Sequence, residues 1–221
     1  TCPIRQRLQV KAWRLAPLRI DAHLRDVKRT RTSFDYDVAV IGSGSGGFAA
    51  ARTAAAAGLD TVVIEGGCEV GGLCILRGCM PSKALLHAAE VLHLARHGKT
   101  WGLRLPKAGF NFTQVMARKD RMIEDFASYR RKQLANARFK FVRANARFTD
   151  AHTLVLSPVG LSTSPRLQRT IRARHFVIAT GSVVSPPPLP QLAPLNYITS
   201  DEALTLKRLP KSLIVLGGGA I

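Results

Sequence analysis

The apolar residues of this chain follow several different periods, and each period predicts an element of secondary structure. Continuous apolar runs at residues 38–41 and 61–64 predict short strands that are buried on both faces. The alanine-rich run at 48–57, which ends at Gly58, predicts a helix between them. A strand–helix–strand unit this short predicts two parallel strands joined by a right-handed crossover.

After this unit the apolar residues are spaced as in helices, and further along the chain they alternate with polar residues as in strands. Apolar residues three and four apart predict helices over 82–96 and 112–137, and Asn111 with Gln114 forms a capping pattern for the second helix. Lys119 interrupts the apolar stripe of that helix. The other expected elements are strands at 139–148, 153–156, 171–180 and 212–216, an extended proline-rich linker at 183–194 and a short helix at 200–206. The predicted fold class is α/β, with a parallel sheet, a crossover helix and an antiparallel meander.

Composition and charge narrow the class of protein. The 221 residues are 46% hydrophobic with 18 glycines and 12 prolines, which argues against collagen, coiled coil and wholesale disorder, and no apolar run is long enough to span a membrane. The formal net charge is +19, concentrated in residues 1–34 and 101–150. This excess is typical of nucleic-acid-binding proteins, or of one part of a larger protein whose other part holds the balancing acidic residues. We expect the second, because the chain begins at Thr1 and stops within a glycine motif.

Residues 1–34 show no sustained apolar period. They are rich in arginine and poor in acidic residues, a composition found both in transit peptides and in disordered leaders. We expect a basic, disordered leader on a cytoplasmic protein, and organellar targeting by this segment is the alternative.

Gly42, Gly44 and Gly47 form a G-x-G-x-x-G pattern between the first expected strand and its helix. In this context the first glycine permits a tight turn, the second lets the backbone approach a pyrophosphate, and the third allows close helix–strand packing. The N-terminus of the following helix favours the anionic phosphates. Glu65, at the end of the second strand, can accept hydrogen bonds from the ribose hydroxyls of an adenosine. The segment predicts a dinucleotide-binding site.

Cys74 and Cys79 are the second candidate for chemistry, because four cysteines are too few for a disulfide scaffold but suit a redox-active pair. Five residues of ideal helix would separate their Cα atoms by about 7.5 Å, beyond the roughly 7 Å that a disulfide tolerates. A bridge between them therefore needs a loop or a distorted turn, which Gly78 permits. Pro81 suits the first position of the next helix.

That helix would place Cys79 at its positive end, near Lys83, and both features favour a thiolate. Two alternatives remain open at this point. The two thiols could be buried and inert, or they could bind zinc together with Cys68 and a histidine such as His87, although the spacing matches no common zinc motif.

The glycine pattern, Glu65, the C-x-x-x-x-C-M-P-S-K segment at 74–83 and the Ala-Thr-Gly-Ser segment at 179–182 together resemble the pyridine nucleotide-disulfide oxidoreductases. These are homodimeric FAD enzymes that include dihydrolipoamide dehydrogenases, mercuric reductases and glutathione reductases. The resemblance implies a Rossmann-like FAD domain whose FAD-binding residues are Gly42, Gly44, Ser45, Gly46, Gly47, Glu65, Gly72, Ala146, Thr180, Gly181 and Ser182.

The resemblance also implies roles for the catalytic residues. Cys74 would exchange with substrate, Cys79 would face the flavin as a charge-transfer thiolate, and Lys83 would lie near the flavin. Gly217 and Gly219 would open the NAD(P) fingerprint of a second Rossmann-like domain.

The implied organisation is a leader at 1–34, an FAD-binding domain at 35–186, and a linker with the start of an NAD(P)-binding domain at 187–221. The implied activity passes electrons between NAD(P), FAD and a disulfide formed by Cys74 and Cys79. We expect a small-molecule dithiol or disulfide substrate, as in dihydrolipoamide dehydrogenase, with a mercuric-reductase-like enzyme as the alternative. In this family a C-terminal domain forms the homodimer and brings an acid–base pair, so we expect residues 1–221 alone to be inactive. We expect neither a bound metal nor a membrane partner.

The non-enzymatic alternative is a basic nucleic-acid-binding protein. It would use aromatic residues between the basic groups of 119–148, but their spacing is that of a helix stripe and an alternating strand, so we expect them in the core. These aromatic residues are Phe126, Tyr129, Phe139, Phe141 and Phe148. The histidines at 87, 93, 97 and 152 are expected to be structural or solvated.

Overall fold

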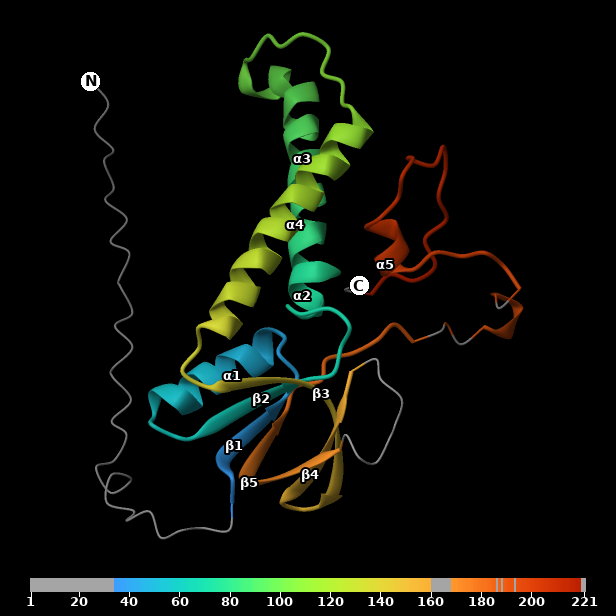
Figure 1. Ribbon diagram of the computed structural model, residues 1–221. Coiled ribbons are helices and arrows are strands. Elements are labelled where there is room, and N and C mark those ends of the chain that lie inside the picture. The colour runs from blue at the N-terminus through green and yellow to red at the C-terminus, as the bar shows by residue number, and fades with distance from the viewer. Residues whose placement is uncertain (1–33, 160–167, 186, 188, 193, 220–221) are drawn as a thin grey trace, which may run out of the picture. The chain divides into compact units, whose positions relative to one another are not determined.

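The structure is a computed structural model that describes residues 34–159, 168–185, 187, 189–192 and 194–219 (Figure 1). The expected leader lies outside the described residues, apart from Phe34. The elements follow in chain order, and 3-10 turns at Gly98–Trp101 and Pro190–Leu192 accompany them. They are β1 (Tyr36–Ile41), α1 (Ser45–Ala56), β2 (Thr61–Glu65), α2 (Leu73–Leu76), α3 (Cys79–Arg96), α4 (Phe112–Ala135), β3 (Lys140–Asp150), β4 (Thr153–Pro158), β5 (Arg169–Ile178) and α5 (Ser200–Ala203).

The strands form two sheets that share their two longest members. β1 pairs in parallel with β2 and β5, and β2 pairs in parallel with β3, so the parallel sheet has the order β3-β2-β1-β5. β3, β4 and β5 form an antiparallel meander. β3 changes partner after Arg143 and β5 after Arg172, so the hydrogen bonding closes into a ring (Figure 1). This arrangement confirms the predicted α/β fold with a parallel unit and a meander.

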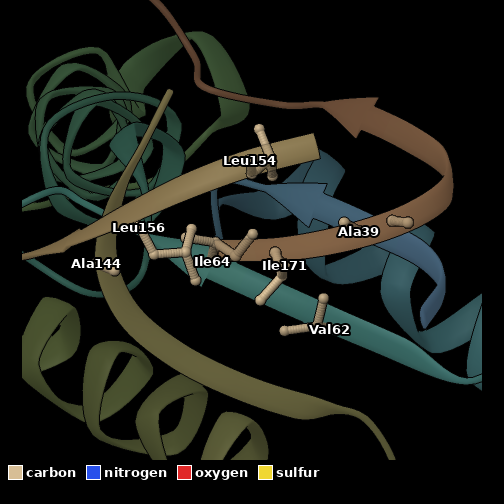
Figure 2. Packing of buried hydrophobic residues seen from close by; sticks show 8 residues of the cluster. Ala39, Val62, Ile64, Ala144, Leu154, Leu156 and Ile171 are labelled. Atoms are coloured by element: carbon tan, nitrogen blue, oxygen red, sulfur yellow. The ribbon is translucent and has the colours of Figure 1, made fainter. Parts of the chain in front are cut away.

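Two apolar clusters lie on opposite faces of the parallel sheet, because successive residues of a strand point to opposite sides. One cluster fills the space between this sheet and the meander (Figure 2), and it consists of Ala39, Val62, Ile64, Ala144, Leu154, Leu156, Ile171 and Ala173. The other cluster lies beneath α1, and it consists of Val38, Val40, Phe48, Ala51, Val63, Leu134 and Phe139. Burial on both faces explains why β1 and β2 are continuous apolar runs rather than alternating ones.

The helix after the cysteines begins earlier than the sequence predicts. α3 starts at Cys79, so Pro81 is its third residue rather than its first. The first four N–H groups of a helix have no partner within it, and proline at this position therefore removes no helical hydrogen bond. Helical hydrogen bonding is present at the next residue, where the backbone N–H of Ser82 donates to Gly78 O at 3.1 Å.

Residues 212–216 do not form the predicted strand. The side chains of Ile214 and Val215 are 93% and 76% exposed, and no strand of the described residues pairs with this segment. An apolar run becomes a buried strand only when neighbours cover it, and here it has none. The helix predicted at 200–206 is also shorter, because α5 ends at Ala203.

α4 carries a buried cation on its inward face. Lys119 is 5% exposed, and its Nζ donates to Leu204 O at 2.7 Å and lies 2.7 Å from the Asp120 carboxylate. The ammonium group of Lys119 therefore has polar partners, although its side chain is buried on the apolar face of α4. Of the aromatic residues expected in the core, only Phe139 is buried and Phe141 is half-buried. The expectation was wrong for Phe126, Tyr129 and Phe148, which are exposed. None of the helices that the structure describes is long and apolar enough to cross a membrane.

The packing between the two sheets yields a test of stability. Leu154 is fully buried between them, so Leu154→Ala is expected to lower the free energy of unfolding by about 2–5 kcal/mol. The matched control, Leu86→Ala, truncates a leucine of α3 that is 68% exposed, and it should change stability by less than about 0.5 kcal/mol. Urea unfolding of both variants makes the measurement, and equal losses would contradict this assignment of the core.

Candidate functional site: a glycine turn beside a thiol pair

The glycine pattern forms a turn that has no space for side chains at two positions. A β-carbon on Gly42, which has φ +102°, would lie 2.2 Å from Ala179 O. One on Gly47 would lie 1.9 Å from Gly42 O. Both contacts are far below van der Waals distance, so these glycines are required for β1, α1 and the end of β5 to pack together.

Gly44 differs from these two glycines because a β-carbon there would not clash. It is the N-cap residue of α1 with φ −62° and ψ −174°, and no side chain caps the helix. A β-carbon there would meet only Gly72 Cα, at 3.6 Å. The first N–H groups of α1 are therefore available to an anion, with the positive end of the helix behind them.

Glu65 holds this turn in place. Its Oε2 accepts hydrogen bonds from the backbone N–H and the hydroxyl of Ser43, at 2.8 and 2.6 Å, and its Oε1 accepts one from Gly67 N at 2.7 Å. Ser43 is fully buried. A carboxylate offers about four acceptor positions, so Glu65 retains capacity for a ligand hydroxyl while it fixes the turn.

The carboxyl ends of three parallel strands gather the other predicted nucleotide residues. β1 leads into Gly42, β2 ends at Glu65, and β5 leads into Ala179, whose N–H donates to Ile41 O at 2.8 Å. The exposed residues 180–182 follow directly. Ala146 is half-buried on β3, in the part of that strand that has passed into the meander. Ligands of open α/β sheets bind at this edge.

Gly72 joins the cysteine segment to the turn. It has φ +78°, and a β-carbon there would lie 2.4 Å from Gly44 Cα. The backbones of the two segments are therefore in direct contact. Cys74 follows on the single turn of α2, and Cys79 is the first residue of α3, after the break at Arg77 and Gly78. This break is the distorted turn that the spacing of the two cysteines predicts.

Cys74 and Cys79 are free thiols in this structure, so the predicted disulfide is absent. The two side chains instead share a hydrogen bond. A dithiol and a disulfide are the two redox forms of one pair, so two interacting thiols are what the reduced form of such a pair would present.

The environment of Cys74 favours its neutral form. The hydrogen bond to Cys79 raises the pKa of the Cys74 thiol, and burial and the negative charge of the Cys79 thiolate raise it further. A hydrogen bond from Ser45 and the positive charge of Lys83 oppose this shift. Ser45 is the first residue of α1, so the nucleotide turn and the thiol pair are linked through one side chain.

Several predicted residues lie outside this arrangement. Gly217 and Gly219 are exposed on the segment after α5, which has no preceding strand, so the described residues do not build the predicted NAD(P) turn. Cys68 is an exposed free thiol. The described residues contain no group of three or more histidine, cysteine or acidic side chains able to hold a metal ion. His97 Nδ1 bonds to the His93 carbonyl at 2.8 Å, in keeping with a structural role.

Sequence reasoning missed two residues of the site. Ser43 occupies a position of the glycine pattern that any residue can fill, so the sequence does not predict its hydrogen bonds to Glu65. Arg130 lies on α4 with its guanidinium carbon 4.0 Å from the centre of the Phe48 ring. Its position gives a signal, because it lies 11 residues, or about three turns, after the buried Lys119 and four before the buried Leu134.

The geometry described above matches a known family. The model of the pyridine nucleotide-disulphide oxidoreductases matches residues 36–221, and the chain belongs to that family. The family is one of oxidoreductases, and its cofactor classes are the predicted ones, FAD and NAD(P).

Three similar proteins illustrate the relationship. The mitochondrial dihydrolipoyl dehydrogenase of Schizosaccharomyces pombe is 34% identical over 97% of this chain and 41% of its own length. The mercuric reductase of Streptomyces lividans is 36% identical over 84% of this chain and 38% of its own length. The Cu(II) complex of the HOCl-induced flavoprotein disulfide reductase RclA from Escherichia coli aligns with TM-score 0.59 at 26% identity, over 79% of this chain and 35% of that one. The chain thus spans about two fifths of the curated relatives.

The residues present fit FAD. The uncapped N-terminus of α1 suits a pyrophosphate, the space over Gly44 would be filled by any side chain there, and Glu65 has remaining acceptor capacity. The same edge of the sheet carries Thr180. Gly44 and Glu65 are therefore the residues that we expect to hold the two ends of the ADP part.

This fit predicts the effect of one substitution. Gly44→Val is expected to fold, because a β-carbon at Gly44 has no close contact, but its side chain would occupy the space over the turn. Flavin retained after purification, measured by absorbance, should fall at least about tenfold. Gly109→Val is the control, since a β-carbon at Gly109 meets nothing within 4 Å and the residue lies in the loop before α4. Unchanged flavin content in Gly44→Val would place the nucleotide elsewhere.

Proposed function

We propose that this chain is the FAD-binding and thiol-bearing part of a dihydrolipoamide dehydrogenase-like enzyme. The observation that carries the proposal is the pair Cys74 and Cys79, which share a hydrogen bond beside the nucleotide turn. Ser45 and the contact between Gly72 and Gly44 hold the pair against that turn. When bound, FAD supplies electron transfer between the nicotinamide and the protein disulfide.

The two cysteines have different environments and different proposed roles. Cys74 has a raised pKa because of Cys79 and burial, so it is the thiol that carries a proton when the pair is reduced. Cys79 begins α3, whose positive end favours a negative charge on the sulfur. Lys83 lies one turn further along the same helix, and its positive charge acts on Cys74. This asymmetry suits Cys79 as the leaving thiolate when the disulfide opens.

The proposed exchange transfers two electrons to the protein. A substrate thiolate attacks Cys74 Sγ of the disulfide, a substrate–Cys74 bond forms, and Cys79 leaves as a thiolate. The second thiolate of the substrate then attacks the substrate sulfur that is bonded to Cys74. Cys74 leaves as a thiolate and takes a proton. The substrate dithiol becomes a disulfide, and the protein disulfide becomes the dithiol pair seen in the structure.

Three further elements belong to the proposal. NAD(P) accepts the electrons, and a homodimer supplies the acid–base pair that deprotonates the substrate, as the family resemblance implies. The substrate is a small dithiol. Cytoplasmic localisation and the division into a leader, an FAD domain and a second domain stay predictions.

A mercuric-reductase-like activity is the second candidate, and it is favoured by the 36% identity to the Streptomyces lividans enzyme. The same thiol pair would then bind Hg(II) instead of exchanging with a dithiol, because thiolates are strong ligands for soft metal ions.

A stoichiometric exchange experiment tests the proposal without requiring turnover. The oxidised chain is mixed with dihydrolipoamide at about pH 8.5, where more substrate is thiolate, and protein thiols are counted after the substrate is removed. We expect two new thiols per chain. Cys74→Ser and Cys79→Ser should give none, because neither variant can form the pair, whereas Cys68→Ser should behave like the wild type because its thiol lies outside the pair.

The result separates the two candidate functions. An oxidised pair that dihydrolipoamide leaves intact, together with one-to-one Hg(II) binding by the reduced pair, would favour the mercuric-reductase-like activity. If the number of thiols does not change on oxidation at all, Cys74 and Cys79 are not a redox pair and both candidates fail.

A further inference from the structure

Arg130 has buried polar atoms that the packing of α4 does not explain. Its Nε and Nη1 are buried and have no hydrogen-bond partner among the described residues. Leaving the donors of a buried guanidinium unpaired costs free energy, so an arginine in such a position calls for an explanation beyond packing. The face of the Phe48 ring lies beneath the guanidinium and supports the positive charge, with the guanidinium carbon 4.0 Å from the ring centre.

The location of Arg130 connects it to the thiol pair. Phe48 lies on α1 three residues after Ser45, and Ser45 shares a hydrogen bond with Cys74. α2, which carries Cys74, packs directly against α4, which carries Arg130. The guanidinium therefore lies where α1, α2 and α4 meet, on the inward stripe of α4 that also includes Ala127 and Leu134.

We propose that Arg130 is a positioning residue for the thiol chemistry: its guanidinium, held on the Phe48 ring, stabilises the thiolate of Cys74 and so keeps this thiol reactive. The inference rests on the proposed role of Cys74 as the thiol that exchanges with substrate. It adds a residue outside the cysteine segment to the machinery of that exchange.

The charges around the two groups support this direction. Burial lowers the pKa of Arg130, the nearby charge of Arg52 lowers it further, and the Cys74 thiolate opposes both effects. An electrostatic interaction acts equally on its two partners, so a thiolate that stabilises the guanidinium is itself stabilised by it. The other groups that face Cys74 are Cys79 and Lys83 of α3, and only the lysine favours the thiolate by its charge.

A positive charge in addition to that of Lys83 would help Cys74 to become a thiolate. The hydrogen bond to Cys79 and burial both favour the neutral form of Cys74, which is a poor nucleophile, and a second positive charge counteracts them. In the exchange reaction, Cys74 must leave as a thiolate in one direction and attack as a thiolate in the other. Arg130 offsets part of the cost of this charge from α4, and its buried Nε and Nη1 have no hydrogen-bond partner among the described residues.

Alkylation of the reduced full chain by iodoacetamide tests the proposal. Cleavage after Glu69 and Arg77 places Cys68, Cys74 and Cys79 on separate peptides, so mass spectrometry follows each rate as a function of pH. In Arg130→Gln and Arg130→Met the rate for Cys74 at pH 7 should fall about 3- to 10-fold and its pH profile should shift to higher pH. Arg130→Lys keeps the charge and should restore the rate to within about twofold. The rate for Cys68 should be the same in every variant.

Arg131→Gln is the matched control, because Arg131 is the next residue on α4 and its guanidinium pairs with Glu124 instead. It should leave the Cys74 profile unchanged. An unaltered Cys74 profile in Arg130→Gln, or an equal loss in Arg131→Gln, would overturn the proposal. Failure of both the Gln and the Met variants to fold, judged by circular dichroism, would assign Arg130 to packing alone and overturn it as well.

The outcome is independent of the proposed function. If dihydrolipoamide does not open the disulfide but the alkylation profile shifts as expected, then Arg130 tunes a thiol whose substrate has been misassigned. If exchange proceeds and the profile does not shift, the proposed function stands and the role of Arg130 falls.

Discussion

Three stretches of backbone approach one another at the nucleotide turn more closely than any β-carbon would allow, and the position of each candidate site residue depends on this contact. Gly42 meets the carbonyl of Ala179, Gly47 meets the carbonyl of Gly42, and Gly72 meets the Cα of Gly44. The first two contacts bring the end of β5 and the start of α1 onto β1. The third brings the cysteine segment onto the turn. At Gly44 itself a β-carbon would make only an ordinary van der Waals contact, 3.6 Å from Gly72 Cα.

Polar groups also fix the conformation of the turn. Glu65 accepts three hydrogen bonds, two from Ser43 and one from Gly67, and so ties the end of β2 to the loop after β1. A site arranged in advance loses less conformational freedom when it binds. Since Glu65 is also the residue expected to contact the ribose, one carboxylate serves both the fold and recognition.

Much of the fold could be predicted from the sequence, because burial on both faces leaves a local record. Three sequence patterns each correspond to a packing neighbour that is present in the structure. They are the continuous apolar runs of β1 and β2, the alternation in β3, and the glycine pattern. The segment at 212–216 has the same apolar record but no neighbour among the described residues, and it stays exposed. An apolar run indicates that a segment can be buried as a strand, but it does so only where another part of the fold pairs with it and covers it.

The candidate site was predictable where its residues are close in sequence and not where they are distant. Gly42, Gly44 and Gly47 lie within one turn, and the break at Gly78 follows from the spacing of Cys74 and Cys79. The bonds from Ser43 to Glu65 span 22 residues. Arg130, which lies on the Phe48 ring, comes from another helix than the thiols. Such contacts depend on how elements pack, and a single sequence records them only faintly, as a charged residue on an apolar stripe.

The two thiols share one loop but differ in what surrounds them, and this difference gives the pair a direction. Cys79 lies at the positive end of α3, whereas Cys74 is held neutral by its neighbour and by burial. A disulfide opens most readily when the sulfur under attack is accessible and the other sulfur leaves as a stable thiolate. Cys74 is half-buried and Cys79 is exposed, so accessibility alone does not select Cys74. Attack at Cys74 with departure of Cys79 satisfies the second condition, because it leaves the negative charge on the sulfur at the start of α3. The reverse order would place that charge on the sulfur whose pKa is raised, so the local fold, rather than the two cysteines themselves, favours the order of exchange that we propose.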